Sequence, residues 1–197
     1  PDFLFGATKN LSVEKFDPEG AKRLLAEAGW PDGFGITIHA PNNRYVNDEQ
    51  IAQAVAQMLT RGGIATKVVA MPSATFFPQA TDLKFSLMLL GWSTGTGEAS
   101  SSLKALLMTY NRDKGFGTAN RGRYSNTKVD ALTEDALQTV DDVRREAYLQ
   151  RATEIAIADT GIIPLHFQVN LWAARDGIVY TPRLDEQTHA HRMKPRG

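Results

Sequence analysis

The chain has 197 residues, with 22 Lys and Arg balanced by 22 Asp and Glu, and it contains no cysteine. This length suits one domain or one large lobe with a sizeable core. The balanced charge argues against a nucleic-acid groove or a polybasic membrane patch, and the lack of cysteine excludes a disulfide framework and a cysteine-based metal site. No apolar run approaches the length of a membrane span.

The first predicted element is a helix that leads through a tight turn into a strand. Asp17 is suited to cap the helix, and Gly29 is suited to end it in the left-handed conformation. Between them, apolar residues recur at helical spacing, namely Ala21, Leu24, Leu25 and Ala28. The turn over 30–33 leads into a predicted strand over 34–40.

Strands and helices alternate along the rest of the chain. After the first strand we expect a helix capped by Asn47 or Asp48 and ending at 62, a strand over 64–71, a short helical segment over 73–82 and a buried strand over 85–90. A loop over 91–100, a short helix up to 110 and an irregular excursion over 111–124 follow. The last predicted elements are helices starting at 126 or 127 and at 141, one or two strands within 162–173, and an unpacked tail over the last ten residues. This order predicts the α/β class, with a mixed or mainly parallel sheet flanked by helices.

The stretch 91–95 matches the G-x-S-x-G pattern of an α/β-hydrolase and follows a predicted buried strand. Asp159 and His166 follow Ser93 in the hydrolase order. Against this reading, a nucleophile elbow enters its helix directly after the serine, whereas loop residues continue here to about Ser100. The sequence also lacks a glycine-rich oxyanion segment after an earlier strand. We therefore interpret 91–95 as a loop and keep a small hydrolase using Ser93 as the alternative.

Two loops are candidates for contact with a ligand. Trp92 lies at the carboxyl end of the strand predicted over 85–90, where open α/β sheets bind ligands. The polar loop that starts at Asn42 follows the strand over 34–40 and could meet the Trp92 loop at the same sheet edge. In this loop Arg44 offers a fork for a carboxylate and Tyr45 a stacking face, although an exposed polar turn would have the same composition.

The four histidines do not predict a metal site. His39 and His166 lie in predicted strands and suit packed positions, and His189 and His191 lie in the tail. A His-x-His pair without a fixed scaffold seldom makes a specific site. We expect no metal and no cofactor.

Five segments, in order, resemble family 5 of the extracytoplasmic solute-binding proteins, the peptide- and nickel-type receptors of ABC importers. The segments are the helix and turn over 16–34, the helix end over 59–64, the strand running into Gly91-Trp92, the helix start over 120–132, and the strand over 162–172. Each motif is modest, but together they cover about 16 to 175 in the family's order.

The resemblance implies one lobe of a two-lobe fold of the periplasmic-binding-protein type II kind. It divides the chain into a connecting segment (1–16) from a missing first lobe, the second lobe (17–176), and a returning segment with a C-terminal tail (177–197). It also implies a receptor that is not an enzyme. Such a receptor captures a small solute, peptide or peptide-like, outside the cytoplasm (in the periplasm) and delivers it to an inner-membrane permease.

The resemblance also assigns contact residues. Family contacts map onto Asn42, Arg44 and Tyr45 in one loop and onto Gly91, Trp92 and Ser93 in the other, and we add Thr94 and Glu98 to this candidate set. Peptide-binding members carry an aspartate shortly after the Gly-Trp pair to hold the peptide's amino group. Here that place falls on Gly95, and Glu98 is the nearest acid.

Overall fold

The computed structural model describes residues 4–183 and 185–197. The elements in chain order are α1 (Pro18–Glu27), β1 (Phe34–Pro41), α2 (Asp48–Arg61), β2 (Ile64–Met71), α3 (Ser73–Thr81), β3 (Leu87–Met88), α4 (Ala99–Ser102), the π-helical turn η1 (Leu103–Leu107), α5 (Thr127–Gln138), α6 (Asp142–Ala158), β4 (Ile178–Tyr180), the 3₁₀ turn η2 (Ala190–Arg192) and β5 (Met193–Pro195). The α/β class expected from the sequence is confirmed. None of the helices in the described ranges is long and apolar enough to cross a lipid bilayer.

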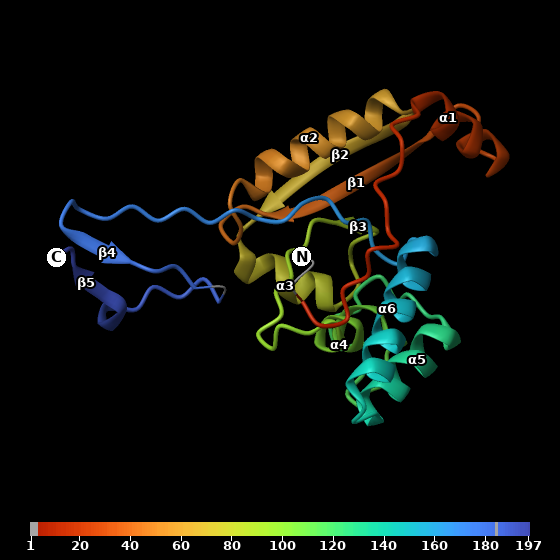
Figure 1. Cartoon of the computed structure of the whole chain (residues 1–197). Helices are drawn as coiled ribbons and strands as arrows, with labels where there is room; N and C mark the ends of the chain where they lie inside the picture. Colours follow the sequence, from red (N-terminus) through yellow and green to blue (C-terminus); the bar gives the residue numbers. More distant parts are fainter. Residues whose placement is uncertain (1–3, 184) are drawn as a thin grey trace.

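The main sheet has three parallel strands in the order β2-β1-β3. β1 pairs with β2 over its whole length and with β3 only at Ile38 and His39. Helices cover both faces (Figure 1): α2 packs on one face against Ile38 and Ala40, and α3 packs on the other face, where Phe76 contacts Phe85. Because the strands are parallel, the loops that follow β1 and β3 leave the sheet at the same edge.

A second packed cluster lies around α5 and α6. It joins Leu103 and Leu107 of η1 to buried residues of the two helices, namely Val129, Ala136, Leu149, Ala152 and Ala156. α5 begins at Thr127, and Asn126 caps it, since its side chain accepts a hydrogen bond from the Lys128 amide at 2.9 Å. The N-terminal segment packs against this cluster. Gly6 lies so close to Leu149 that a Cβ added to Gly6 would be 2.7 Å from Leu149 Cβ.

The first helix confirms the predicted cap and end, but its apolar residues are not buried. Asp17 Oδ1 accepts a hydrogen bond from the Gly20 amide at 2.8 Å, and Gly29 has φ of +89°. No residue of α1 is buried, and Leu24 is 66% exposed. The apolar stripe therefore forms a helix without covering a core within the described residues.

The strand predictions need two corrections. The apolar run over 85–90 forms only the two-residue strand β3, and the segment 162–173 forms no strand at all. Strand formation depends on a neighbouring strand, and within the described residues the segment 162–173 has no ladder partner. It runs extended from α6 across the body toward β4 (Figure 1), and most of its apolar side chains are exposed.

The C-terminal end is also more ordered than expected. The prediction of an unpacked tail is wrong for β5, because Met193–Pro195 pairs antiparallel with Ile178–Tyr180. This pair forms a separate two-stranded sheet that projects from the body (Figure 1). A turn at Asp176 and Gly177 precedes β4, and Gly177 has φ of +90°.

Candidate functional site

The loops after β1 and β3 meet at the carboxyl edge of the sheet. The Tyr45 hydroxyl donates a hydrogen bond to the Gly91 carbonyl at 3.0 Å. The Tyr45 ring also lies close against Gly91, because a Cβ added there would be 2.6 Å from the ring atom Cε1. The expected meeting of the two loops is thus confirmed, and Gly91 is required for the close approach.

Asp48 organises the first loop in a way that the sequence did not show. Its buried carboxylate accepts hydrogen bonds from the backbone amides of Arg44 and Tyr45, at 2.9 and 3.0 Å. Asn47 occupies the N-cap position of α2, but its side chain makes no cap hydrogen bond. Asp48, a predicted cap of α2, therefore mainly fixes the backbone of the loop. The sequence signal for this role is an acid four residues after Arg44 and three after Tyr45.

Arg44 in the first loop and Trp92 in the second are both exposed to solvent. Trp92 is 47% exposed, so it is not a core residue. The Arg44 guanidinium carbon lies 5.0 Å from the centroid of the Tyr45 ring, a cation–π distance. Among residues 4–183 and 185–197, Arg44 has no carboxylate partner. A cation and an indole are therefore available to a ligand beside the Tyr45–Gly91 contact.

The remaining candidates differ in what they offer. Asn42 and Ser93 are exposed, whereas Thr94 is engaged within its own loop. The Thr94 hydroxyl lies 2.7 Å from the Ser101 hydroxyl and donates to the Glu98 carbonyl at 3.2 Å. The Glu98 carboxylate accepts a hydrogen bond from Arg145 Nη2 and is only 17% exposed. Glu98 thus has a partner within the protein and is poorly placed to replace the family's aspartate.

The geometry at Ser93 is not that of a hydrolase. The residues after Ser93 are not helical, and the next helix begins only at Ala99. Asp159 is engaged elsewhere, because it accepts a hydrogen bond from the side-chain Nδ2 of Asn126. This bond is the main reason that the pKa of Asp159 lies below its ordinary value. In the described part of the chain no hydrogen bond joins Ser93, Asp159 and His166. The strand–turn–helix of a nucleophile elbow is absent here.

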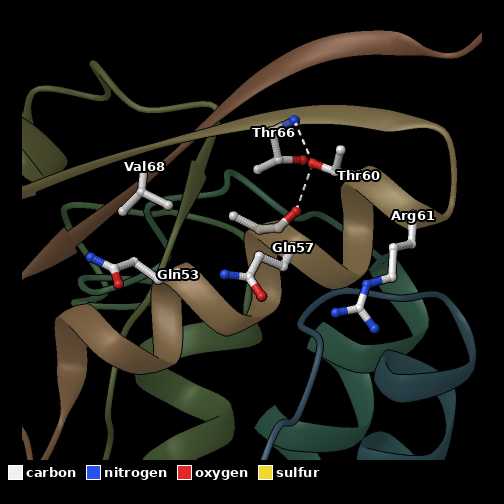
Figure 2. A pocket seen from close by; sticks show the side chains of 7 residues that line it. Gln53, Gln57, Thr60, Arg61, Thr66 and Val68 are labelled. Carbon is white, nitrogen blue, oxygen red and sulfur yellow. Dashed lines mark hydrogen bonds between the residues drawn. The ribbon is translucent and has the colours of Figure 1, made fainter.

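A groove lies between α2 and the outer edge of β2 (Figure 2), away from the two loops. The Thr60 hydroxyl accepts from the Thr66 amide at 3.2 Å and donates to the Ala56 carbonyl at 2.8 Å. The other lining residues are Gln53, Gln57, Arg61 and Val68. None of the candidate contact residues lines it, so we do not count this groove as part of the site.

The fold is that of solute-binding proteins of the periplasmic type II kind. The structure of HbpA2 from Haemophilus parasuis has a TM-score of 0.80 and 25% identity, covering 100% of this chain and 39% of that one. The dipeptide binding protein from Pseudoalteromonas sp. SM9913 in complex with Met-Leu has a TM-score of 0.72 and 25% identity, covering 82% of this chain and 32% of that one.

Residues 1–114 match the family described as bacterial extracellular solute-binding proteins, family 5 Middle, and the chain belongs to this family. The glutathione-binding protein GsiB of Escherichia coli K12 is 30% identical over 155 residues, which are 76% of this chain and 30% of GsiB. Heme-binding protein A of Haemophilus influenzae is 29% identical over 175 residues, 86% of this chain and 31% of that protein. The chain thus spans about a third of the length of these relatives. The family resemblance found in the sequence is confirmed.

Proposed function

We propose that this chain is the solute-contacting second lobe of a receptor that serves an ABC importer. The receptor captures a small peptide or peptide-like solute outside the cytoplasm, in the periplasm, and delivers it to an inner-membrane permease without chemical change. Membership of the extracellular solute-binding family supports the binding role. The relatives named for glutathione and for a Met-Leu complex support the peptide-like solute.

The contact between Tyr45 and Gly91 carries the assignment of the site. It joins two loops that are separate in the sequence. One loop exposes Arg44, a cation for a carboxylate, and the other exposes Trp92, an aromatic face for an apolar or planar group. Asn42 supplies an exposed amide at the same edge. The site therefore suits a small solute that carries a carboxylate.

Recognition of an amino group is expected to differ from that of peptide-binding members. Gly95 offers no carboxylate, and the Glu98 carboxylate is paired with Arg145. An incoming ammonium would have to compete with a guanidinium for Glu98, in a partly buried setting where ion pairs are poorly screened by solvent. We therefore expect affinity to depend on the solute's carboxylate more than on its amino group.

The proposed division of the chain gives 1–16 and 177–197 to connections with a first lobe and 17–176 to this lobe. An exposed apolar row supports a larger receptor. From 161 to 173 the chain has no Asp, Glu, Lys or Arg, and five alternate side chains are exposed: Ile163 (66%), Leu165 (49%), Phe167 (74%), Val169 (72%) and Leu171 (90%). Exposed apolar patches of this kind mark surfaces that other polypeptide covers.

Calorimetric titration of the full-length receptor with reduced glutathione and with Met-Leu tests the proposal. We expect at least one of them, or a close analogue, to bind, and Arg44→Met to weaken that binding at least about tenfold, because a charge-assisted contact is lost. Arg23→Met is the matched control, since Arg23 lies on α1 and is 69% exposed. Equal losses in both variants, or none in Arg44→Met, would contradict the assignment of Arg44.

A further inference from the structure

The loop that carries Trp92 is held at a few points. A Cβ added to Gly95 or Gly97 would meet nothing within 4 Å, whereas the Thr94 hydroxyl lies 2.7 Å from the Ser101 hydroxyl and donates to the Glu98 carbonyl at 3.2 Å. Its near end is held by the Tyr45–Gly91 contact. Its far end is Glu98, just before α4. Because Thr94 also donates to the Glu98 carbonyl, the contacts that fix Glu98 help to set the conformation of the loop.

The backbone around Glu98 is held by the N-terminal segment. The Phe5 amide donates to the Gly97 carbonyl at 3.2 Å, and the Ala99 amide donates to the Phe5 carbonyl at 3.0 Å, which makes a parallel bridge between Phe5 and Glu98. The N-terminal segment is in turn fastened to α6, where Gln150 Nε2 donates to the Ala7 carbonyl at 3.0 Å.

The side chain of Glu98 is held by the same helix. Arg145 of α6 donates to the Glu98 carboxylate across 47 positions of sequence, and its guanidinium carbon lies 5.6 Å from the centroid of the Phe5 ring. The two side chains are 29% and 17% exposed, so this is a partly buried pair and not a surface pair free in solvent. Arg145 thus contacts both of the residues that pair at the end of the loop.

In the described part of the chain, Glu98 is the one carboxylate that pairs with Arg145. Within residues 4–183 and 185–197 its Nε is buried without a hydrogen-bond partner. Loss of Glu98 would leave this partly buried guanidinium without its charge partner, which costs free energy. Because Arg145 lies on α6, the ion pair ties the Glu98 side chain to that helix.

We propose that Arg145 is a positioning residue for the solute site, holding the loop 91–98 from its far end so that Trp92 is presented in one conformation before any solute arrives. The inference rests on the proposed function, because that function makes Trp92 a solute contact. Preorganising a loop in its binding conformation reduces the ordering cost of binding. Arg145 acts without touching the solute.

Backbone NMR order parameters of the 197-residue chain, without any ligand, test the positioning role. We expect residues 92–97 to fall from about 0.85 in the parent to below about 0.6 in Arg145→Met, while α6 keeps its values. Arg145→Lys and the charge-reversed pair Glu98→Arg with Arg145→Glu should restore most of the order. Arg151→Met is the control on the same helix, since its partner Glu154 lies outside the loop.

A loop that stays equally ordered in a folded Arg145→Met variant would overturn the proposal. If Arg145→Met does not fold, Glu98→Gln decides, because it keeps the shape and removes the ion pair; an ordered loop in Glu98→Gln would likewise overturn it. Glutathione titration of the full-length receptor separates this result from the proposed function. A loop that loosens in Arg145→Met supports the positioning role, and no binding of glutathione or Met-Leu by the parent receptor would count against the proposed solute class alone.

Discussion

Replacing Gly91 by alanine tests the contact on which the site is built. The added Cβ would lie 2.6, 2.9 and 3.0 Å from three carbons of the Tyr45 ring, distances that a folded protein does not tolerate. Overpacking a rigid neighbour costs about 1–3 kcal/mol, but this ring is the end of a side chain and can swing away. Swinging breaks the hydrogen bond to the Gly91 carbonyl, which contributes about 0.5–1.5 kcal/mol.

We therefore expect Gly91→Ala to lower the free energy of unfolding by about 1 kcal/mol. Urea unfolding of the 197-residue chain should show this as a lower midpoint with an unchanged slope. In a Tyr45→Ala background the same substitution should be nearly neutral, because the clash and the hydrogen bond are already gone. Gly95→Ala is the matched control, since its Cβ would meet nothing within 4 Å. A full loss in the Tyr45→Ala background would refute the reasoning.

Three further predictions follow from other parts of the molecule. The pKa of Tyr124 is raised to about 12, first by burial and then by its hydrogen bond to Asp159. The stability that this tyrosine contributes is therefore complete below pH 10 and is lost as the pH rises through 12. The difference between ultraviolet titrations of the parent and of Tyr124→Phe should show a tyrosine ionising near pH 12, and one ionising near pH 10 would contradict the prediction. Activated esters should show no turnover that Ser93→Ala abolishes, and burst kinetics that vanish in that variant would revive the hydrolase reading. In the full-length receptor, the thiol of Phe167→Cys should react with a thiol-labelling reagent at least about tenfold more slowly than the thiol of His166→Cys, because we expect other polypeptide to cover the apolar row. Both thiols should react freely in the 197-residue chain. Equal rates in the receptor would show that the row is not covered.

Local features of the structure could be predicted from the sequence because local chemistry decides them. Asp17 caps α1 and Gly29 ends it as expected, since a side-chain acceptor and a residue free to adopt positive φ act within one turn. The meeting of Tyr45 with Gly91 also followed from a general rule, that loops after neighbouring parallel strands leave the sheet at one edge.

Features that depend on distant partners could not be predicted in this way. The apolar alternation over 162–173 is typical of a strand, but a strand also needs a neighbour, and that segment has none in the described part of the chain. The sequence indicates Glu98 as a possible solute contact because it is the nearest acid to Gly95. Its partner is Arg145, 47 positions away, and no local pattern indicates that pair.

The measurement that tests the account most directly is made on Trp92→Ala in the full-length receptor. Solute affinity and thermal unfolding are determined on the same preparation. Trp92 is 47% exposed, and it follows Gly91, which contacts Tyr45, so its indole is available to a solute and contributes little to the core. Truncating an aromatic anchor at a binding site costs about 2 kcal/mol or more, which is roughly thirtyfold in affinity.

We predict that Trp92→Ala weakens binding of the solute at least about tenfold while the melting temperature stays close to that of the parent. Gly95→Ala, in the same loop, should change neither quantity. Unchanged affinity together with a sharp loss of stability would show that Trp92 packs in the protein and does not contact the solute, and it would contradict the site described here.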